Sequence, residues 1–120
     1  MKYTNIDRVK SALFSLAGAM PDKLFHTWRG NALMLLYHRI VPDDEVAPEF
    51  NPNSYSEVTC SLFEDHIIEL AARFHVVSID HLYQHILKKS KDFVVSITFD
   101  DGYKDNLIYA LPILERHNVP

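Results

Sequence analysis

A run of β-branched and apolar residues at positions 94–99 is the clearest hydrophobic pattern in the chain, and it ends abruptly at Asp100, Asp101 and Gly102. An unbroken run of this length, bounded by turn residues, predicts a strand buried on both faces, as in a parallel sheet. Active-site residues in parallel α/β folds lie at the carboxyl ends of the strands, so the two carboxylates are candidate functional groups. Gly102 would let the chain turn tightly and approach a ligand closely. An Asp-Asp-Gly sequence also closes strands without any chemistry, and the pattern alone leaves that plain turn open.

A second apolar run covers residues 31–40 and becomes polar at His38 and Arg39. If this strand lies parallel to the one at 94–99, His38 lies beside Asp100. His38 then either orients a carboxylate, contacts a substrate or caps a strand end, and the sequence leaves these alternatives open.

A helix is predicted over residues 59–74, which follow the strand at 31–40 in the chain. Its start fits either Thr59 as the cap or a capping box of Ser61 with Glu64. His66 falls on the polar side and is expected to be solvated. The expected buried stripe has apolar residues at helical spacing, namely Leu62, Phe63, Ile67, Leu70, Ala71 and Phe74.

A second helix is predicted to follow a short strand at residues 75–78. Ser78 or Asp80 is expected to cap it, and it runs to about residue 89. Its expected inward positions are Ile79, Leu82, Tyr83 and Ile86.

Residues 41–58 carry three prolines and no periodic pattern, which predicts a loop of a length often used as a lid or binding loop. A third helix is predicted over residues 104–118, with Asp105 or Asn106 at its start and Leu107, Leu111 and Leu114 on its apolar side. Pro112 lacks the backbone donor that a helix interior needs, so a kink or restart is expected near Ala110.

The first 30 residues are predicted to form a separate helical segment, followed by one domain at residues 31–120. Ile6, Val9, Leu13 and Leu16 recur at helical spacing. A basic start before a short apolar stretch also has some features of a signal peptide. Because that signal is weak, the sequence favours the cytoplasm over export.

The composition narrows the class of protein further. The chain has 120 residues and 48% apolar residues, which is enough for one small globular domain. Its net charge of −4 disfavours a nucleic-acid partner. The single Cys60 excludes an intrachain disulfide. No apolar run approaches the length needed to span a bilayer.

Residues 97–103, Ile-Thr-Phe-Asp-Asp-Gly-Tyr, resemble the first signature motif of the polysaccharide deacetylases, carbohydrate esterase family 4, whose catalytic region is the nodulation-factor-deacetylase-like homology domain. Residues 36–40, 74–79 and 109–120 resemble flanking strands and the following helix of that family, in the same order. The resemblance covers about residues 31–120, and the combination is more specific than any one segment.

The resemblance implies an α/β fold, the N-terminal portion of a (β/α) barrel-like deacetylase. A full barrel of this kind needs roughly 200–250 residues. About three βα units fit in this chain, so the resemblance implies a truncated domain. The histidine pair of the family's metal site would then lie beyond Pro120.

The activity implied by the resemblance is metal-dependent hydrolysis of N-acetyl groups on a polysaccharide of amino sugars. The cofactor would be a divalent metal, usually zinc, held by one aspartate and two histidines. Asp101 would be the metal ligand and Asp100 the catalytic general base. His38, Gly102 and Tyr103 would contact the substrate or support the metal site.

His81 and His85 lie four residues apart, a spacing that can chelate a metal on a helix. The family's second motif is also a pair of this spacing, but it follows the acidic motif and has Ser or Thr after its first histidine. Here the pair precedes Asp100 and Leu82 follows the first histidine. We therefore expect both to be solvated surface residues.

Two other functions remain open. A catalytically inactive domain could bind a glycan or a protein partner, and an unpaired sheet edge could mediate self-association. A flavodoxin-like phosphoacceptor would also place acids at strand ends, but it requires further acidic and lysine-bearing strand ends that this order does not provide.

Overall fold

The computed structural model describes residues 31–44, 51–52 and 54–120. The chain separates into two units, residues 1–30 and 31–120. The helix expected before residue 31 lies outside the described residues. No helix in the described ranges is long and apolar enough to cross a membrane.

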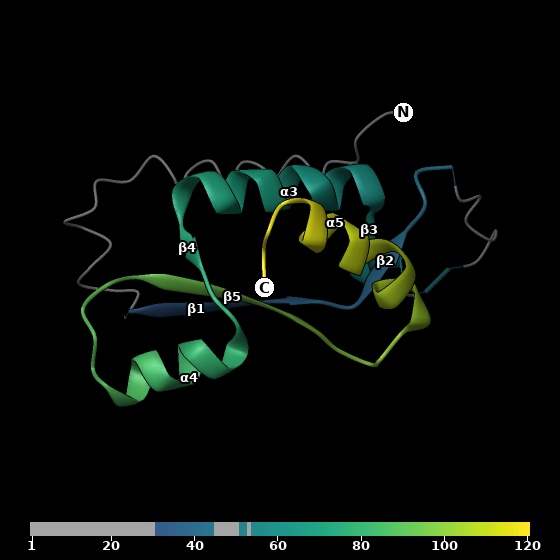
Figure 1. Cartoon of the computed structure of the whole chain (residues 1–120). Helices are drawn as coiled ribbons and strands as arrows, with labels where there is room; N and C mark the ends of the chain where they lie inside the picture. The colour runs from purple at the N-terminus through teal and green to yellow at the C-terminus, as the bar shows by residue number, and fades with distance from the viewer. Residues whose placement is uncertain (1–30, 45–50, 53) are drawn as a thin grey trace. The chain divides into compact units, whose positions relative to one another are not determined.

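Three parallel strands form the main sheet: β1 (Ala32–Tyr37), β5 (Val94–Phe99) and β4 (His75–Val76). Their order is β1-β5-β4, so β5 is central, as Figure 1 shows. β1 and β5 pair over their whole length, from Ala32 opposite Val94 to Tyr37 opposite Phe99. The two strands predicted from apolar runs are therefore present and parallel.

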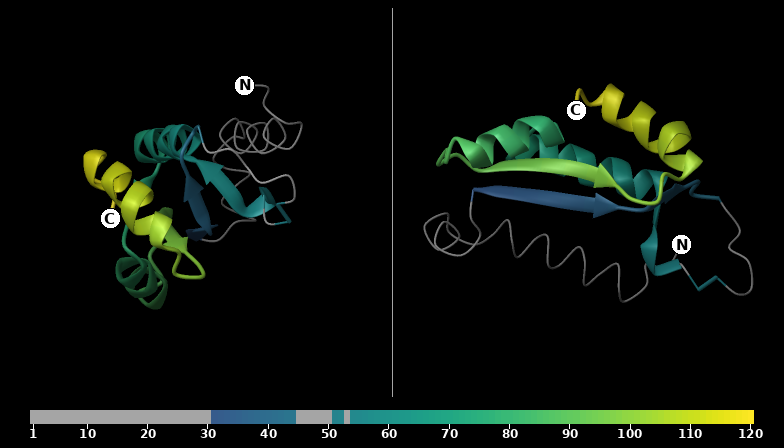
Figure 2. Two further views of the ribbon diagram at one scale, coloured as in Figure 1. Left: turned by 90° about the vertical axis from the view of Figure 1, so that its right-hand side faces the viewer. Right: turned by 90° about the horizontal axis from the view of Figure 1, so that it is seen from below.

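The two helices between the strands lie on opposite sides of this sheet, α3 (Cys60–Arg73) on one and α4 (Ile79–Leu87) on the other (Figures 1 and 2). The chain passes from β1 beyond β5 to reach β4, and then returns to β5. Right-handed crossovers that run in opposite directions place their helices on opposite faces. The described unit is thus an open α/β sheet with both faces partly covered.

The buried stripe of α3 is narrower than expected. Phe63 and Ile67 are fully buried and Leu70 is nearly so, but Ala71 is exposed. Thr59 is the N-cap, since its Oγ1 accepts a hydrogen bond from the Leu62 amide at 3.4 Å. The alternative cap, a capping box that includes Glu64, is not formed because Glu64 pairs with another helix instead.

The expectation for α4 is wrong at most of its apolar positions. Ser78 caps the helix, as predicted, but only Leu82 is buried. Leu82 packs with Val77 and Val94 beneath the amino-terminal end of β5. Ile79, Tyr83 and Ile86 are 46%, 58% and 53% exposed. Among the described residues of this helix only Leu82 is buried, and its other apolar side chains stay about half exposed.

The segment predicted as a plain loop contains short regular elements. β2 (Arg39–Val41) and β3 (Glu57–Thr59) form a second, parallel two-stranded sheet, and a 3-10 turn at Ser54–Ser56 precedes β3. The strand expected over 31–40 is therefore two strands that break at His38. Strands of three residues are too short to leave a periodic signal, which explains why the sequence did not predict them.

The last helix is irregular near Ala110, where Pro112 predicted a kink or restart, but the chain stays helical through this point. A π-helical turn, η2 (Asn106–Ala110), leads into α5 (Leu111–Arg116), with the proline in the first turn of α5. There its missing N–H costs no intrahelical hydrogen bond. The expected apolar side is only partly correct, because Leu114 is buried whereas Leu107 and Leu111 are 65% and 40% exposed. The predicted side-chain cap at Asp105 or Asn106 is absent.

Candidate functional site

The carboxyl ends of β1 and β5 lie side by side and bring two predicted site residues to one edge. The Asp100 amide donates a hydrogen bond to the Tyr37 carbonyl at 2.9 Å, which extends the ladder one residue past the strands. His38 and Asp100 each follow a paired strand end. The structure therefore has the arrangement predicted for them, with Asp100 at the carboxyl end of central β5 and His38 at the same edge, at the end of the neighbouring parallel strand β1.

The acidic turn, residues 100–103, has an uncommon backbone. Asp101 has φ of 64° and Gly102 has φ of 61°, so two successive residues are left-handed. Glycine adopts this conformation without strain, and aspartate tolerates it better than most residues do. Apart from its two neighbours in the chain, no described residue would lie within 4 Å of a Cβ at residue 102. Within the described chain, Gly102 is thus explained by its φ and not by close packing.

Both carboxylates of the turn face solvent. Asp100, Asp101 and Tyr103 are all classed as exposed, with Tyr103 38% exposed. No hydrogen bond or ion pair joins either carboxylate to another described residue. Two adjacent acids held open at a strand end are a suitable arrangement for a cation and for proton transfer.

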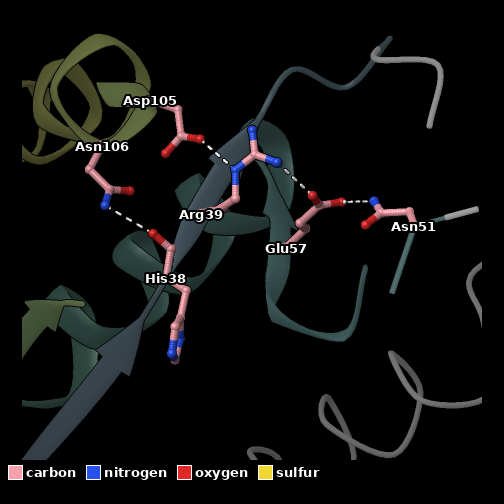
Figure 3. A network of polar contacts seen from close by, with 6 residues as sticks. All are labelled: His38, Arg39, Asn51, Glu57, Asp105 and Asn106. Atoms are coloured by element: carbon pink, nitrogen blue, oxygen red, sulfur yellow. Dashed lines mark hydrogen bonds and ion pairs between the residues drawn. The ribbon is translucent and has the colours of Figure 1, made fainter. Parts of the chain in front are cut away.

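A charged network lies next to this turn and was not predicted. Figure 3 shows Arg39 between two acids: its Nε donates to Asp105 Oδ2 and its Nη1 donates to Glu57 Oε1, each at 2.8 Å. The other oxygen of Glu57 accepts from Asn51 Nδ2 at 2.9 Å. A sequence signal did exist, because a lone arginine beside the buried Ile40 needs an acidic partner.

His38 contributes to the network through its backbone. Its carbonyl accepts a hydrogen bond from Asn106 Nδ2 at 2.9 Å, and its ring points away from Arg39 (Figure 3). Asp105 Oδ1 and Asn106 Oδ1 are buried without a partner among the described residues. Among the described residues, Asp105 is therefore hydrogen-bonded through Oδ2 to Arg39, and Asn106 through Nδ2 to the His38 carbonyl.

An aromatic cluster packs directly before the edge and consists of Tyr37, Phe63 and Phe99. The Tyr37 ring meets those of Phe63 and Phe99 at centroid distances of 5.0 and 5.9 Å. Its hydroxyl is 3.1 Å from His66 Nδ1. Burial raises the pKa of Tyr37 to about 12. The expectation that His66 is solvated is wrong, since this histidine is half-buried against the end of β1.

His81 and His85 lie on α4, away from the acidic turn. His81 is exposed, and His85 Nε2 is 2.7 Å from the carbonyl oxygen of Asp92. Their helix packs through Leu82 at the start of β5, which is roughly 20 Å from Asp100 at about 3.3 Å per strand residue. Neither imidazole is placed to assist Asp101.

The described residues contain no group of three or more His, Cys, Asp and Glu side chains that could hold a metal ion. Catalytic zinc sites use three protein ligands. The acidic turn therefore fits part of such a site, with carboxylate oxygen as its donor, and does not form one alone.

Comparison with known proteins gives one informative match. No family model and no curated protein matches the sequence. The solved structure of a de-N-acetylase from Aggregatibacter actinomycetemcomitans is similar to this chain, with a TM-score of 0.58 and 26% identity. The match covers 74% of this chain and 35% of that one. The chain therefore has a deacetylase-like α/β fold and spans about a third of the length of this structural neighbour.

Proposed function

We propose that the edge formed by His38 and residues 100–103 is part of the active site of a metal-dependent hydrolase. Its substrate would be an N-acetylated amino-sugar polysaccharide, and its open sheet would be the N-terminal portion of a (β/α) barrel. The observation that carries this proposal is the pair of adjacent, exposed carboxylates at the end of central β5, neither of which is paired with another described residue. The likeness to a de-N-acetylase supports this chemistry over the others that two carboxylates allow.

The two carboxylates take separate roles in this proposal. Asp101 would provide one ligand to a divalent cation, usually zinc in sites of this kind, together with further ligands outside the described residues. The bound cation would polarise the acetyl carbonyl and the attacking water.

Asp100 would act as the general base and would accept the proton of that water as its oxygen adds to the amide carbon. The carbon–nitrogen bond then breaks, the amine nitrogen takes up a proton, and acetate and the free amine leave.

The remaining edge residues would orient the sugar. Tyr103, the last residue of the turn, is exposed and would offer an aromatic face, and the half-buried His38 lies at the same edge. Gly102 would keep the turn narrow enough for a sugar polymer to approach both carboxylates.

The test is a titration of the 120-residue chain with Mn²⁺, whose paramagnetism broadens nearby amide resonances. Broadening is expected at residue 38 and residues 100–103. Asp101→Asn should weaken it strongly, whereas Asp100→Asn should largely retain it. Asp65→Asn, at an exposed acid on α3, is the matched control and should change nothing. The opposite pattern for the two site variants would reverse their roles, and absence of local broadening would overturn the metal site.

Acetate release and glycan binding complete the test. We expect little or no release from chitooligosaccharide by this chain alone, because one carboxylate ligand does not retain zinc well. Chitooligosaccharide should nevertheless shift the amides at residue 38 and residues 100–103. Shifts that need no metal and survive Asp101→Asn would favour an inactive glycan-binding domain instead. Absence of any shift would contradict both functions.

A further inference from the structure

Arg39 joins three chain segments that are distant in sequence. It is the first residue of β2, and its ion pairs reach Glu57 on β3 and Asp105 just before η2. The side chains of both acids are mostly buried, 15% and 12% exposed, and that of Arg39 is 29% exposed. Pairs this sheltered from water are screened less than surface pairs, so they can fix a local geometry.

The same side chain also holds the far end of the acidic turn. The Arg39 guanidinium lies over the Tyr103 ring, 5.3 Å from its centroid. Asp105 follows two residues later and is paired with the same guanidinium. At the near end, the Asp100 amide is bound to the Tyr37 carbonyl. Both ends of the turn are thus anchored to the short segment 37–39.

We infer that Arg39 is a positioning residue for the acidic turn, and that it keeps Asp101 left-handed so that both carboxylates stay presented at the edge. The left-handed conformation costs free energy at a residue with a side chain, and persists where the surroundings fix it. If the exit of the turn were released, φ of Asp101 would relax and its carboxylate would turn away. The inference can be tested by the backbone conformation of the turn and by its affinity for Mn²⁺. Of these two measurements, only the Mn²⁺ affinity rests on the proposed function.

The geometry requires arginine and not simply a positive charge. The guanidinium is planar and presents Nε and Nη1 to two different acids while its face covers Tyr103. A lysine ammonium is a point charge on a flexible stem and does not combine a planar face with this fixed fork. Arg39→Lys should therefore preserve the charge and the fold. It should lose the geometry that holds Glu57, Asp105 and Tyr103 around one guanidinium.

The decisive variant is Arg39→Lys, compared with Asp105→Asn and with Arg73→Lys as a surface control. Asn at residue 105 keeps an oxygen acceptor for Arg39, and Arg73 is an exposed residue on α3. Amide shifts and hydrogen exchange should change at residues 100–106 in Arg39→Lys but stay unchanged at 94–99. Its Mn²⁺ affinity should fall roughly 10-fold, the lower end of the range for residues that support metal ligands.

Asp105→Asn should show a smaller change at the turn, and Arg73→Lys none. A folded Arg39→Lys variant with unaltered turn amides would overturn the inference. If the unmodified chain shows no Mn²⁺ broadening, the proposed function fails. The amide shifts and hydrogen exchange of residues 100–106 in Arg39→Lys would still test the role of Arg39.

Discussion

The aromatic cluster and the acidic turn are both built from β1 and β5, yet they have opposite properties. Tyr37 and Phe99 pack around the fully buried Phe63, whereas the next residues along each strand are the half-buried His38 and the exposed Asp100. One step along the chain thus separates residues that hold the strands together from residues available for chemistry. A rigid strand pair allows this division, because backbone pairing fixes where its ends lie and leaves the side chains of the end residues available.

The comparison implies that substitutions in the cluster mainly affect stability and substitutions in the turn mainly affect binding. Phe63→Ala should have the largest effect, destabilising the unit by about 3–5 kcal/mol through lost burial and the cavity left behind. Because small domains have only about 5–15 kcal/mol in total, this variant should be close to unfolded.

Urea denaturation followed by circular dichroism measures that effect. Ile68→Ala on the same helix is the control, since Ile68 is 47% exposed and should change stability by less than about 1 kcal/mol. Equal effects of the two variants would mean that α3 does not pack on the sheet as described.

Tyr37→Phe tests how closely the cluster is linked to the edge. Loss of the hydrogen bond to His66 should cost about 1 kcal/mol near neutral pH. Burial raises the pKa of the folded-state Tyr37 to about 12, above the ordinary value of about 10. Its contribution is therefore fully present below pH 10 and is lost as pH rises through 12.

The free energy of unfolding should thus fall between pH 10 and 12 in the native sequence and fall less in Tyr37→Phe. The ultraviolet difference between the native sequence and Tyr37→Phe isolates the Tyr37 phenol, whose pKa in the folded chain should be about 12. If the Tyr37 phenol ionises near its ordinary pKa of about 10 in the folded chain, Tyr37 is not buried.

Asp101→Gly tests the other half of the comparison. Glycine adopts a φ of 64° freely, so the variant should be as stable as the native sequence or more stable by up to about 1 kcal/mol. At the same time it should lose Mn²⁺ broadening at the turn. Thermal unfolding and the metal titration measure the two effects separately. A clear loss of stability would show that the Asp101 carboxylate supports the fold.

The sequence predicted the strands and the acidic edge because each rests on a local pattern. The run at 94–99, followed by two acids and a glycine, determines both the strand and its polar end. The narrow packing of α4 was not predictable in this way. The helical period predicts which positions are apolar, but burial depends on how much of the sheet lies beneath each position, and among the described residues of α4 only Leu82 is buried.

Arg39 shows a second limit of local patterns. Its acidic partners Glu57 and Asp105 are 18 and 66 residues away in the chain, so no spacing rule could select them. The sequence could indicate that a charged residue beside a buried strand needs a partner, but only the fold determines which acids meet it. The same holds for His66, whose partner Tyr37 is 29 residues away.

The smallest effect is expected outside both regions, where Glu64 on α3 joins the end of α5. Its Oε1 is 2.8 Å from His117 Nε2 and accepts a hydrogen bond from Arg116 Nη1 at 2.6 Å. These hydrogen bonds, that of His117 first, lower the pKa of Glu64. A lowered pKa means that the contribution is present above the ordinary value of about 4.3 and is lost as pH falls through the folded-state value.

Glu64→Gln should therefore be slightly less stable than the native sequence at pH 7, and the difference should shrink as pH falls towards 3. Urea denaturation at several pH values measures this. Adding Arg116→Gln to Glu64→Gln is the control, since loss of the arginine should have little further effect once the carboxylate is gone. A difference as large as that of Phe63→Ala would contradict the comparison, because an exposed ion pair would then stabilise the unit as much as the buried aromatic cluster does.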